Sequence, residues 1–253
     1  MESPIVKLPK PVKDLASFIL GSPYCYEEIV ENLNFSNVPC LKLGLSKGIG
    51  MGIVFGGCIV KVPQVQKIIS AKSALGVSFL SYFLETLSYI VTISYNLRSN
   101  NPFSTWGETL AITLQNMVIL MLLPFYAGKP SRAILSILSL AGLYYVLSRQ
   151  DIVPSELLGT LYTSTIPIVL ISRVPQIYSN FSNGHTGQLS AFTVFNYFLG
   201  AVARIFTTLQ EVKDNKILIG FILSLGVNSI LALQMVYYWN SKQTVAAKAK
   251  KDN

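Results

Sequence analysis

The sequence predicts an all-α membrane protein with seven transmembrane helices, arranged as two three-helix repeats that a linker helix joins. The first observation behind this prediction is composition: of 253 residues, 51% are hydrophobic and only 13% are charged. A soluble globular chain carries about a quarter charged residues, so this chain has too little polar surface for an exterior in water. The second observation is a pair of similar segments at one constant spacing, which indicates a duplicated unit.

Seven apolar stretches follow one another along the chain, separated by short connections. A transmembrane helix needs about 20 mostly apolar residues. The stretches are 44–65, 77–97, 107–127, 131–148, 157–176, 189–209 and 216–239. Buried helices of a soluble protein account for one or two such stretches but not for seven in succession, so we predict that all seven cross the membrane.

A repeat with a fixed offset relates the first three stretches to the last three. The segment KVPQV at 61–65 recurs as RVPQI at 173–177, so Pro63 corresponds to Pro175. The same difference in residue number, which we call the repeat offset, aligns Asn116 with Asn228. Because a single helix separates the repeats, both insert in the same direction, as in transporters with parallel repeats. The predicted segments are an N-terminal segment (1–43), a first repeat (44–127), a linker helix (128–155), a second repeat (156–239) and a tail (240–253).

Each repeat carries a Pro-Gln pair in its first helix, Pro63-Gln64 and Pro175-Gln176. Proline donates no backbone N–H and its ring clashes with the preceding turn, so a kink is expected there. In the first repeat the carbonyl of Ile59 should lose its donor, and the Gln64 amide can replace it inside the bundle. The pair either forms a hinge that opens one side of the bundle or ends the helix at the membrane interface.

Polar side chains inside the predicted helices are candidates for binding substrate, because such groups are costly in lipid and face the bundle interior. Asn116 and Asn228 have amides suited either to sugar hydroxyls or to hydrogen bonds between helices. Lys61 and Arg173 precede the two Pro-Gln pairs. These cations suit either a lipid phosphate or simple extension of the side chain to the headgroup layer.

Two further charges, Glu85 and Arg204, lie near the middle of predicted helices in different repeats. An uncompensated charge at this depth is expensive, so we expect them to pair with each other or with other polar groups. A pair between the repeats would either hold one closed state or act as a static bridge.

Enzymatic activity, a metal and a cofactor are not predicted. The chain has one histidine, His185, and no nucleophile–base pair, metal-ligand spacing or phosphate-binding glycine loop accompanies it. The net charge of +8 comes from lysines and arginines spread over loops and helix ends, which is typical of residues that set membrane topology. Nucleic acid is therefore not expected as a partner.

Several stretches are selective enough to suggest a family. They run in order over about 35–240 and are VPCLK (38–42), LSKG (45–48), KVPQV (61–65), AKSA (71–74), FSTWGE (103–108), NGHTGQLS (183–190) and ARIFT (203–207). They resemble the mannose-P-dolichol utilization defect 1 family. The two Pro-Gln motifs resemble more broadly the PQ-loop superfamily, which includes SWEET sugar transporters and lysosomal amino-acid exporters.

The resemblance implies an endoplasmic reticulum membrane protein that is required for the use of dolichol-phosphate-mannose and dolichol-phosphate-glucose in N-glycan and GPI-anchor assembly. It also implies substrate contacts by Asn116 and Asn228, because SWEET-like relatives use an asparagine pair on these two helices. Three functions stay open: translocating or presenting the lipid-linked sugar, transporting a small free sugar or amino acid, and serving lumenal glycosyltransferases as a non-transporting adaptor.

The C-terminal tail predicts the cellular location of the protein and its orientation in the membrane. Lys250 and Lys251 are the fourth and third residues from the end, as in a dilysine retrieval signal that cytosolic coat proteins read. A cytosolic tail and seven helices place the N-terminus in the lumen. Basic residues of the tail favour this orientation, and those of the N-terminal segment oppose it.

A lumenal N-terminus sets the chemistry of its cysteines. In an oxidising compartment Cys25 and Cys40 either form a disulfide that ties the N-terminal segment to the first helix or remain free thiols. Asn34 begins a sequon for N-glycosylation on the same side.

Overall fold

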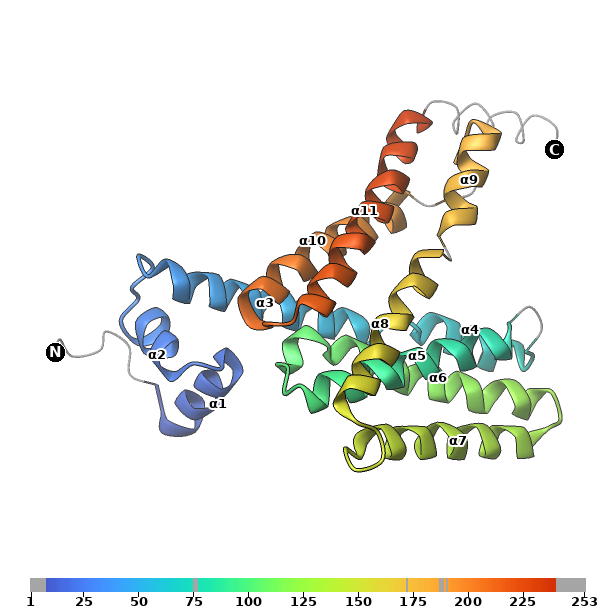
Figure 1. Cartoon of the computed structure of the whole chain (residues 1–253), viewed down its shortest axis with the longest axis horizontal. Coiled ribbons are helices and arrows are strands. Elements are labelled where there is room, and N and C mark those ends of the chain that lie inside the picture. The colour runs from blue at the N-terminus through green and yellow to red at the C-terminus, as the bar shows by residue number, and fades with distance from the viewer. Residues whose placement is uncertain (1–7, 75–76, 172, 187–188, 190, 240–253) are drawn as a thin grey trace. The chain divides into compact units, whose positions relative to one another are not determined.

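Helices form all of the regular structure in the residues that the computed structural model describes, namely 8–74, 77–171, 173–186, 189 and 191–239 (Figure 1). The predicted all-α class is therefore confirmed. The chain divides into two compact units. The first holds Met1–Val153 and Leu209–Lys213, and the second holds Pro154–Thr208 and Asp214–Asn253.

A short helical module precedes the first long helix. The amphipathic helix α1 (Lys10–Leu20) ends at Gly21, whose φ of +67° is the left-handed conformation that glycine favours after a helix. The helix α2 (Pro23–Tyr26) and the π-helical turn η1 (Glu27–Glu31) follow. Ser22 caps α2 with its side chain. The chain then enters the long helix α3.

The first unit contains α3 (Val38–Gly57), α4 (Val62–Ala71), α5 (Phe79–Arg98), η2 (Phe103–Thr105), α6 (Gly107–Tyr126) and α7 (Pro130–Ser148). Helix α6 packs against α3, α4, α5 and α7 and so forms the centre of this unit. Close approach to α3 depends on glycine: a Cβ at Gly57 would lie 2.7 Å from the Cβ of Glu108. Small residues let membrane helices approach closely in this way.

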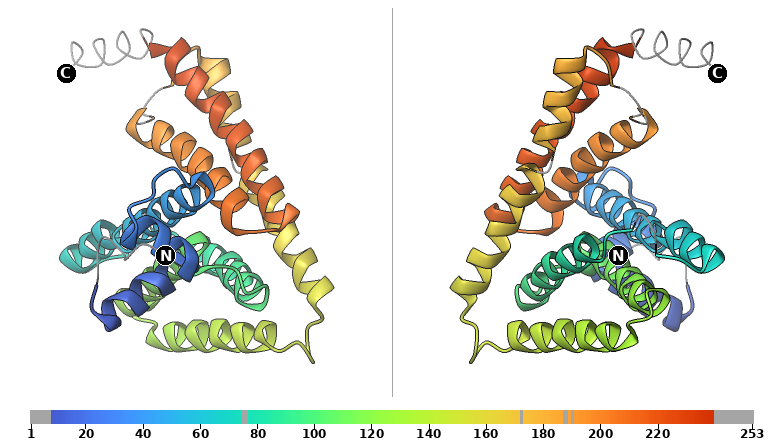
Figure 2. Two further views of the ribbon diagram at one scale, coloured as in Figure 1. Left: turned by 90° about the vertical axis from the view of Figure 1, so that its left-hand side faces the viewer. Right: turned by 90° about the vertical axis from the view of Figure 1, so that its right-hand side faces the viewer.

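The second unit contains α8 (Ser155–Ile171), α9 (Val174–Asn183), most of α10 (Ala191–Glu211) and α11 (Asn215–Tyr237). Helix α11 runs alongside both α8 and α9 (Figure 2). Leu231 and Met235 of α11 are buried in the core of this unit. Their equivalents at the repeat offset, Ile119 and Leu123 of α6, are buried in the core of the first unit. The two repeats therefore build their cores from the same positions.

The chain is a multi-pass membrane protein. Five stretches of the described residues are long and apolar enough to cross a bilayer: Val38–Ala71, Gly107–Tyr126, Pro130–Ser148, Ala191–Glu211 and Asn215–Tyr237. The other two predicted spans are α5, which carries Glu85, and α8, which has 17 residues. Large apolar side chains on the long helices point outward, including Phe55 and Leu233, which are 68% and 69% exposed. A lipid exterior accounts for this exposure.

The first helix of each repeat is interrupted just before its Pro-Gln pair. Helix α3 ends at Gly57 and α4 begins at Val62, whereas α8 ends at Ile171 and α9 begins at Val174. The prediction that the Ile59 carbonyl loses its backbone donor was wrong, because the Val62 N–H donates to it at 3.2 Å. The first helix also begins at Val38, six residues before the predicted start at 44.

A side-chain amide from α6 bridges the break between α3 and α4. The side chain of Gln115 donates to the Gly57 carbonyl at 2.7 Å and accepts the backbone N–H of Lys61 at 2.9 Å. The backbone groups that need side-chain partners are thus the Gly57 carbonyl and the Lys61 N–H, at the two edges of the break. The Ile59 carbonyl, which a simple proline kink would leave without a donor, is not one of them. Gln115 satisfies both of them where water is scarce.

Candidate functional site

A polar cavity of about 510 Å³ lies within the second unit. Helices α9, α10 and α11 supply most of its wall, and we call it the second-repeat cavity. Its polar lining includes Arg173, Gln176, Asn180, Asn183 and Asn228. One cation and four amides therefore face one space, a combination suited to a ligand with hydroxyl groups and a negative charge.

The break before Pro175 places Arg173 at the start of α9, beside the cavity. Its guanidinium carbon lies 4.5 Å from the centre of the Tyr197 ring of α10, a distance at which a cation is attracted to an aromatic face. No aspartate or glutamate is among the described residues that line the cavity. The Arg173 guanidinium therefore stacks on an aromatic ring and faces the cavity without a carboxylate among the described lining.

Hydrogen bonds hold two of the amides in place. The Asn228 amide donates to the hydroxyl of Ser224, one turn earlier on α11, at 3.2 Å. The Asn180 amide donates to the Gln234 side chain at 3.0 Å, and Gln234 in turn donates to the Ile177 carbonyl at 2.9 Å. Asn180 and Gln234 were not predicted as site residues. The signal that could have found Gln234 is an amide inside an apolar run, the same signal that singled out Asn228.

A matching cavity of about 470 Å³ lies within the first unit, and we call it the first-repeat cavity. Seven of its eight lining residues are equivalent, at the repeat offset, to residues that line the second-repeat cavity. They are Gln64, Lys67, Ile68, Ala71, Ser73, Val77 and Tyr82. The polarity differs, because Ile68 and Ala71 stand where the second repeat has Asn180 and Asn183. Both repeats thus form a cavity at one place, and the second is richer in amides.

An ion pair lies next to the first-repeat cavity. The Lys61 ammonium is 3.1 Å from each carboxylate oxygen of Glu85. The Asn116 amide donates to the same carboxylate at 3.1 Å, and the Tyr89 hydroxyl donates to it at 2.9 Å. The ammonium also lies 5.0 Å from the ring centre of Tyr82. The polar groups predicted to bind substrate in this repeat therefore contact a carboxylate of the chain itself.

Comparison with known families now identifies the repeated unit. The PQ loop repeat family matches residues 45–105 and 156–217. The chain carries two PQ-loop repeats. It is similar to the human protein Solute carrier family 66 member 3, with 26% identity over 196 residues that cover 78% of this chain and 94% of the relative. No solved structure matches this PQ-loop chain.

These comparisons confirm the broader of the two predicted resemblances. The PQ-loop superfamily is supported by the matched repeats and by the solute carrier relative. The narrower resemblance to the mannose-P-dolichol utilization defect 1 family stays a prediction.

The remaining predicted residues of this PQ-loop protein fall into separate places. Gln64 and Gln176 line the two cavities, and Pro63 and Pro175 are the second residues of α4 and α9. Glu85 was expected to pair either with Arg204 or with another polar group. In the structure it pairs with Lys61 of its own repeat. The other mid-helix charge, Arg204, is buried in α10. Lys250 and Lys251 of the predicted retrieval signal lie outside the described residues.

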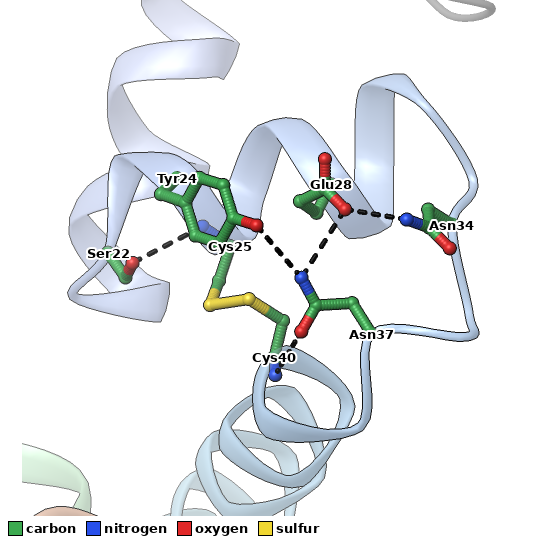
Figure 3. The surroundings of a disulfide bond; sticks show 7 residues. All are labelled: Ser22, Tyr24, Cys25, Glu28, Asn34, Asn37 and Cys40. Carbon is green, nitrogen blue, oxygen red and sulfur yellow. Dashed lines mark hydrogen bonds between the residues drawn. A yellow bond between two sulfur atoms is a disulfide. The ribbon is translucent and has the colours of Figure 1, made fainter.

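The N-terminal module is tied to the first transmembrane helix by a disulfide between Cys25 and Cys40 (Figure 3). Each of these cysteines donates its backbone N–H to a capping side chain, Ser22 for Cys25 and Asn37 for Cys40. The Asn37 amide also reaches the Tyr24 hydroxyl at 3.1 Å. The caps therefore place the two cysteines at the starts of α2 and α3, where their side chains meet.

Proposed function

We propose that this PQ-loop protein translocates or presents dolichol-phosphate-mannose and dolichol-phosphate-glucose at the endoplasmic reticulum membrane, for N-glycan and GPI-anchor assembly. The observation that carries the proposal is the second-repeat cavity, which combines Arg173 with the amides of Asn180, Asn183 and Asn228. A sugar phosphate presents hydroxyl groups and one negative charge. Amides and a guanidinium are the side chains that match these groups.

The polyprenyl tail of such a substrate would stay in lipid. Exposed aromatic side chains alternate with cavity residues on the helices that form the wall. Tyr178 and Phe181, neighbours of Ser179 and Asn180 on α9, are 70% and 73% exposed. Phe192, next to Thr193 at the start of α10, is exposed as well. The same helices thus offer an apolar surface to lipid and a polar surface to the headgroup.

The sequence motifs support the cellular location and the partners that we propose for the protein. The stretches that resemble the mannose-P-dolichol utilization defect 1 family support a location in the endoplasmic reticulum, where lumenal glycosyltransferases would consume the substrate. Lys250 and Lys251 would present a retrieval signal to coat proteins on the cytosolic side, with the N-terminus in the lumen. The activity is binding and transport, and we propose no catalytic step.

A second candidate function is the transport of a small free sugar or amino acid. The observation that favours it is the similarity to a protein named a solute carrier. Reconstitution separates the two functions. Purified protein in liposomes is assayed in parallel for transbilayer movement of a short-chain mannosyl-phosphoryl-dolichol analogue and for uptake of free mannose and amino acids.

We expect fast movement of the lipid-linked sugar by the wild type, and a decrease of about tenfold for Asn228→Ala, because one hydrogen bond to a polar ligand is lost inside an apolar bundle. Asn196→Ala is the matched control: Asn196 is an exposed asparagine of α10 whose amide donates to the Phe192 carbonyl. Saturable uptake of a free solute without movement of the lipid analogue would support the second function. Movement of neither, with stable co-purification of a glycosyltransferase, would support an adaptor.

A further inference from the structure

The surroundings of the two cavities differ in one carboxylate, and this difference has a consequence for ligand binding. At the repeat offset Glu85 corresponds to Tyr197, and Lys61 corresponds to Arg173. In the first repeat the cation therefore has a carboxylate beside it. In the second repeat the cation has an aromatic ring at the equivalent position.

The geometry points to a single anion-binding site in the second-repeat cavity. Arg173 would bind the phosphate group of a phosphate mono- or diester there, and Asn228 would be a neighbouring hydrogen-bond donor. In the first repeat the carboxylate of Glu85 already lies beside the cation, in the place that a bound anion would take. This inference names the substrate chemistry of the cavity and rests on the proposed function only for the identity of the attached sugar lipid.

Contacts in the first repeat support this assignment. Glu85 accepts hydrogen bonds from Lys61, Asn116 and Tyr89 at 2.9 to 3.1 Å. These are the bonds that an oxyanion of a ligand would accept from the same donors. Lys61 and Asn116 both contact Glu85, and none of the three residues lines the first-repeat cavity. An internal carboxylate thus already accepts the hydrogen bonds that these donors could give to an anion.

The equivalent residues of the second repeat face its cavity. Arg173, Tyr197 and Asn228, the equivalents of those three residues, all line the second-repeat cavity. Arg173 stacks on the Tyr197 ring, which leaves the edge of its guanidinium for a planar, two-pronged contact with phosphate. The structure shows no ion pair of Arg173 among the described residues.

The described lining of the first-repeat cavity also includes a cation. Lys67 lines the first-repeat cavity, but its side chain is exposed. An anion held there is screened by water and salt, so we expect it to contribute little to binding. Its position makes Lys67→Gln a matched control, since it removes one cation from the other cavity.

The test is equilibrium binding to the purified full-length protein, with two probes. Mannose 1-phosphate is a soluble phosphate ester, and dolichyl phosphate in mixed micelles is a lipid phosphate. We expect one site per chain for the phosphate group, with affinity reduced about 10- to 100-fold by Arg173→Gln. Tyr197→Glu, which copies the first repeat, should reduce affinity by at least as much. Lys67→Gln and Tyr237→Glu, an added charge at an exposed end of α11, should leave it unchanged.

The converse variant, Glu85→Gln, should raise the stoichiometry from one site to two, because it removes the internal counter-charge of Lys61. If Glu85→Gln does not fold, the comparison of phosphate affinity between Tyr197→Glu and Tyr237→Glu still tests the inference. Equal losses of affinity for Arg173→Gln and Lys67→Gln, or full binding by Tyr197→Glu, would overturn the inference. Binding of mannose 1-phosphate but not of dolichyl phosphate would assign the site to a free phosphate ester. Phosphate binding without any lipid movement in liposomes would refute translocation as the proposed function and leave this site in place.

Discussion

Arg173→Gln should reduce transbilayer movement of a mannosyl-phosphoryl-dolichol analogue by roughly 10- to 100-fold, because the variant removes the charge-assisted bonds to the phosphate. The amides of the second-repeat cavity remain in this variant, so the affinity for the sugar hydroxyls should change less than that for the phosphate. The measurement is the initial rate of movement in liposomes that contain equal amounts of folded protein.

Lys67→Gln is the control for this prediction. It makes the same loss of one positive charge in the equivalent helix of the other repeat, at a side chain that lines the first-repeat cavity. A transport rate close to that of the wild type is expected. Equal slowing by both variants would mean that general surface charge, and not the second-repeat cavity, determines the rate.

The second large effect concerns stability. Glu85→Gln should lower the free energy of unfolding by about 3 kcal/mol, because it leaves the Lys61 ammonium without its counter-charge in a place of limited solvent access. The side chains of Lys61 and Glu85 are only 19% and 31% exposed. Glutamine keeps an acceptor for Asn116 and Tyr89, so the loss reports mainly on the charge pair. Unfolding in detergent, in phosphate-free buffer, measures it.

A double variant separates the charge pair from simple loss of packing. Lys61→Met combined with Glu85→Gln removes both charges, and replacing a buried pair by neutral groups is often close to neutral for stability. We expect the double variant to recover most of the loss. Phosphate should also stabilise the single variant, because a ligand that binds the folded state raises its stability. A double variant as unstable as the single one would contradict the assigned role of the ion pair.

Helix positions followed closely from apolar run lengths. The predicted spans 107–127 and 131–148 each differ by one residue from α6 and α7. The start of the first helix did not follow, because it depends on a local cap and not on hydropathy. Asn37 accepts the backbone N–H of Cys40, and the helix therefore begins six residues before the apolar run, with Pro39 in its first turn.

The contents of the site followed from the sequence only in part. The repeat offset paired Asn116 with Asn228 and Lys61 with Arg173, and it already aligned Glu85 with Tyr197. The ion pair of Lys61 with Glu85 depends on how α4 and α5 are rotated toward each other, which a linear sequence does not specify. Gln115 was missed for a similar reason, since its partners are backbone groups of a helix break on another helix.

Photochemical crosslinking can show directly whether the headgroup binds in the second-repeat cavity. The full-length protein in lipid nanodiscs is irradiated with a dolichyl-phosphate-mannose analogue that carries a diazirine on the sugar, and labelled peptides are mapped by mass spectrometry. We expect labels within 173–197 and around Asn228, which mannose 1-phosphate competes away and Arg173→Gln weakens. Labels confined to the first repeat, or labels that neither the competitor nor the variant reduces, would contradict this expectation.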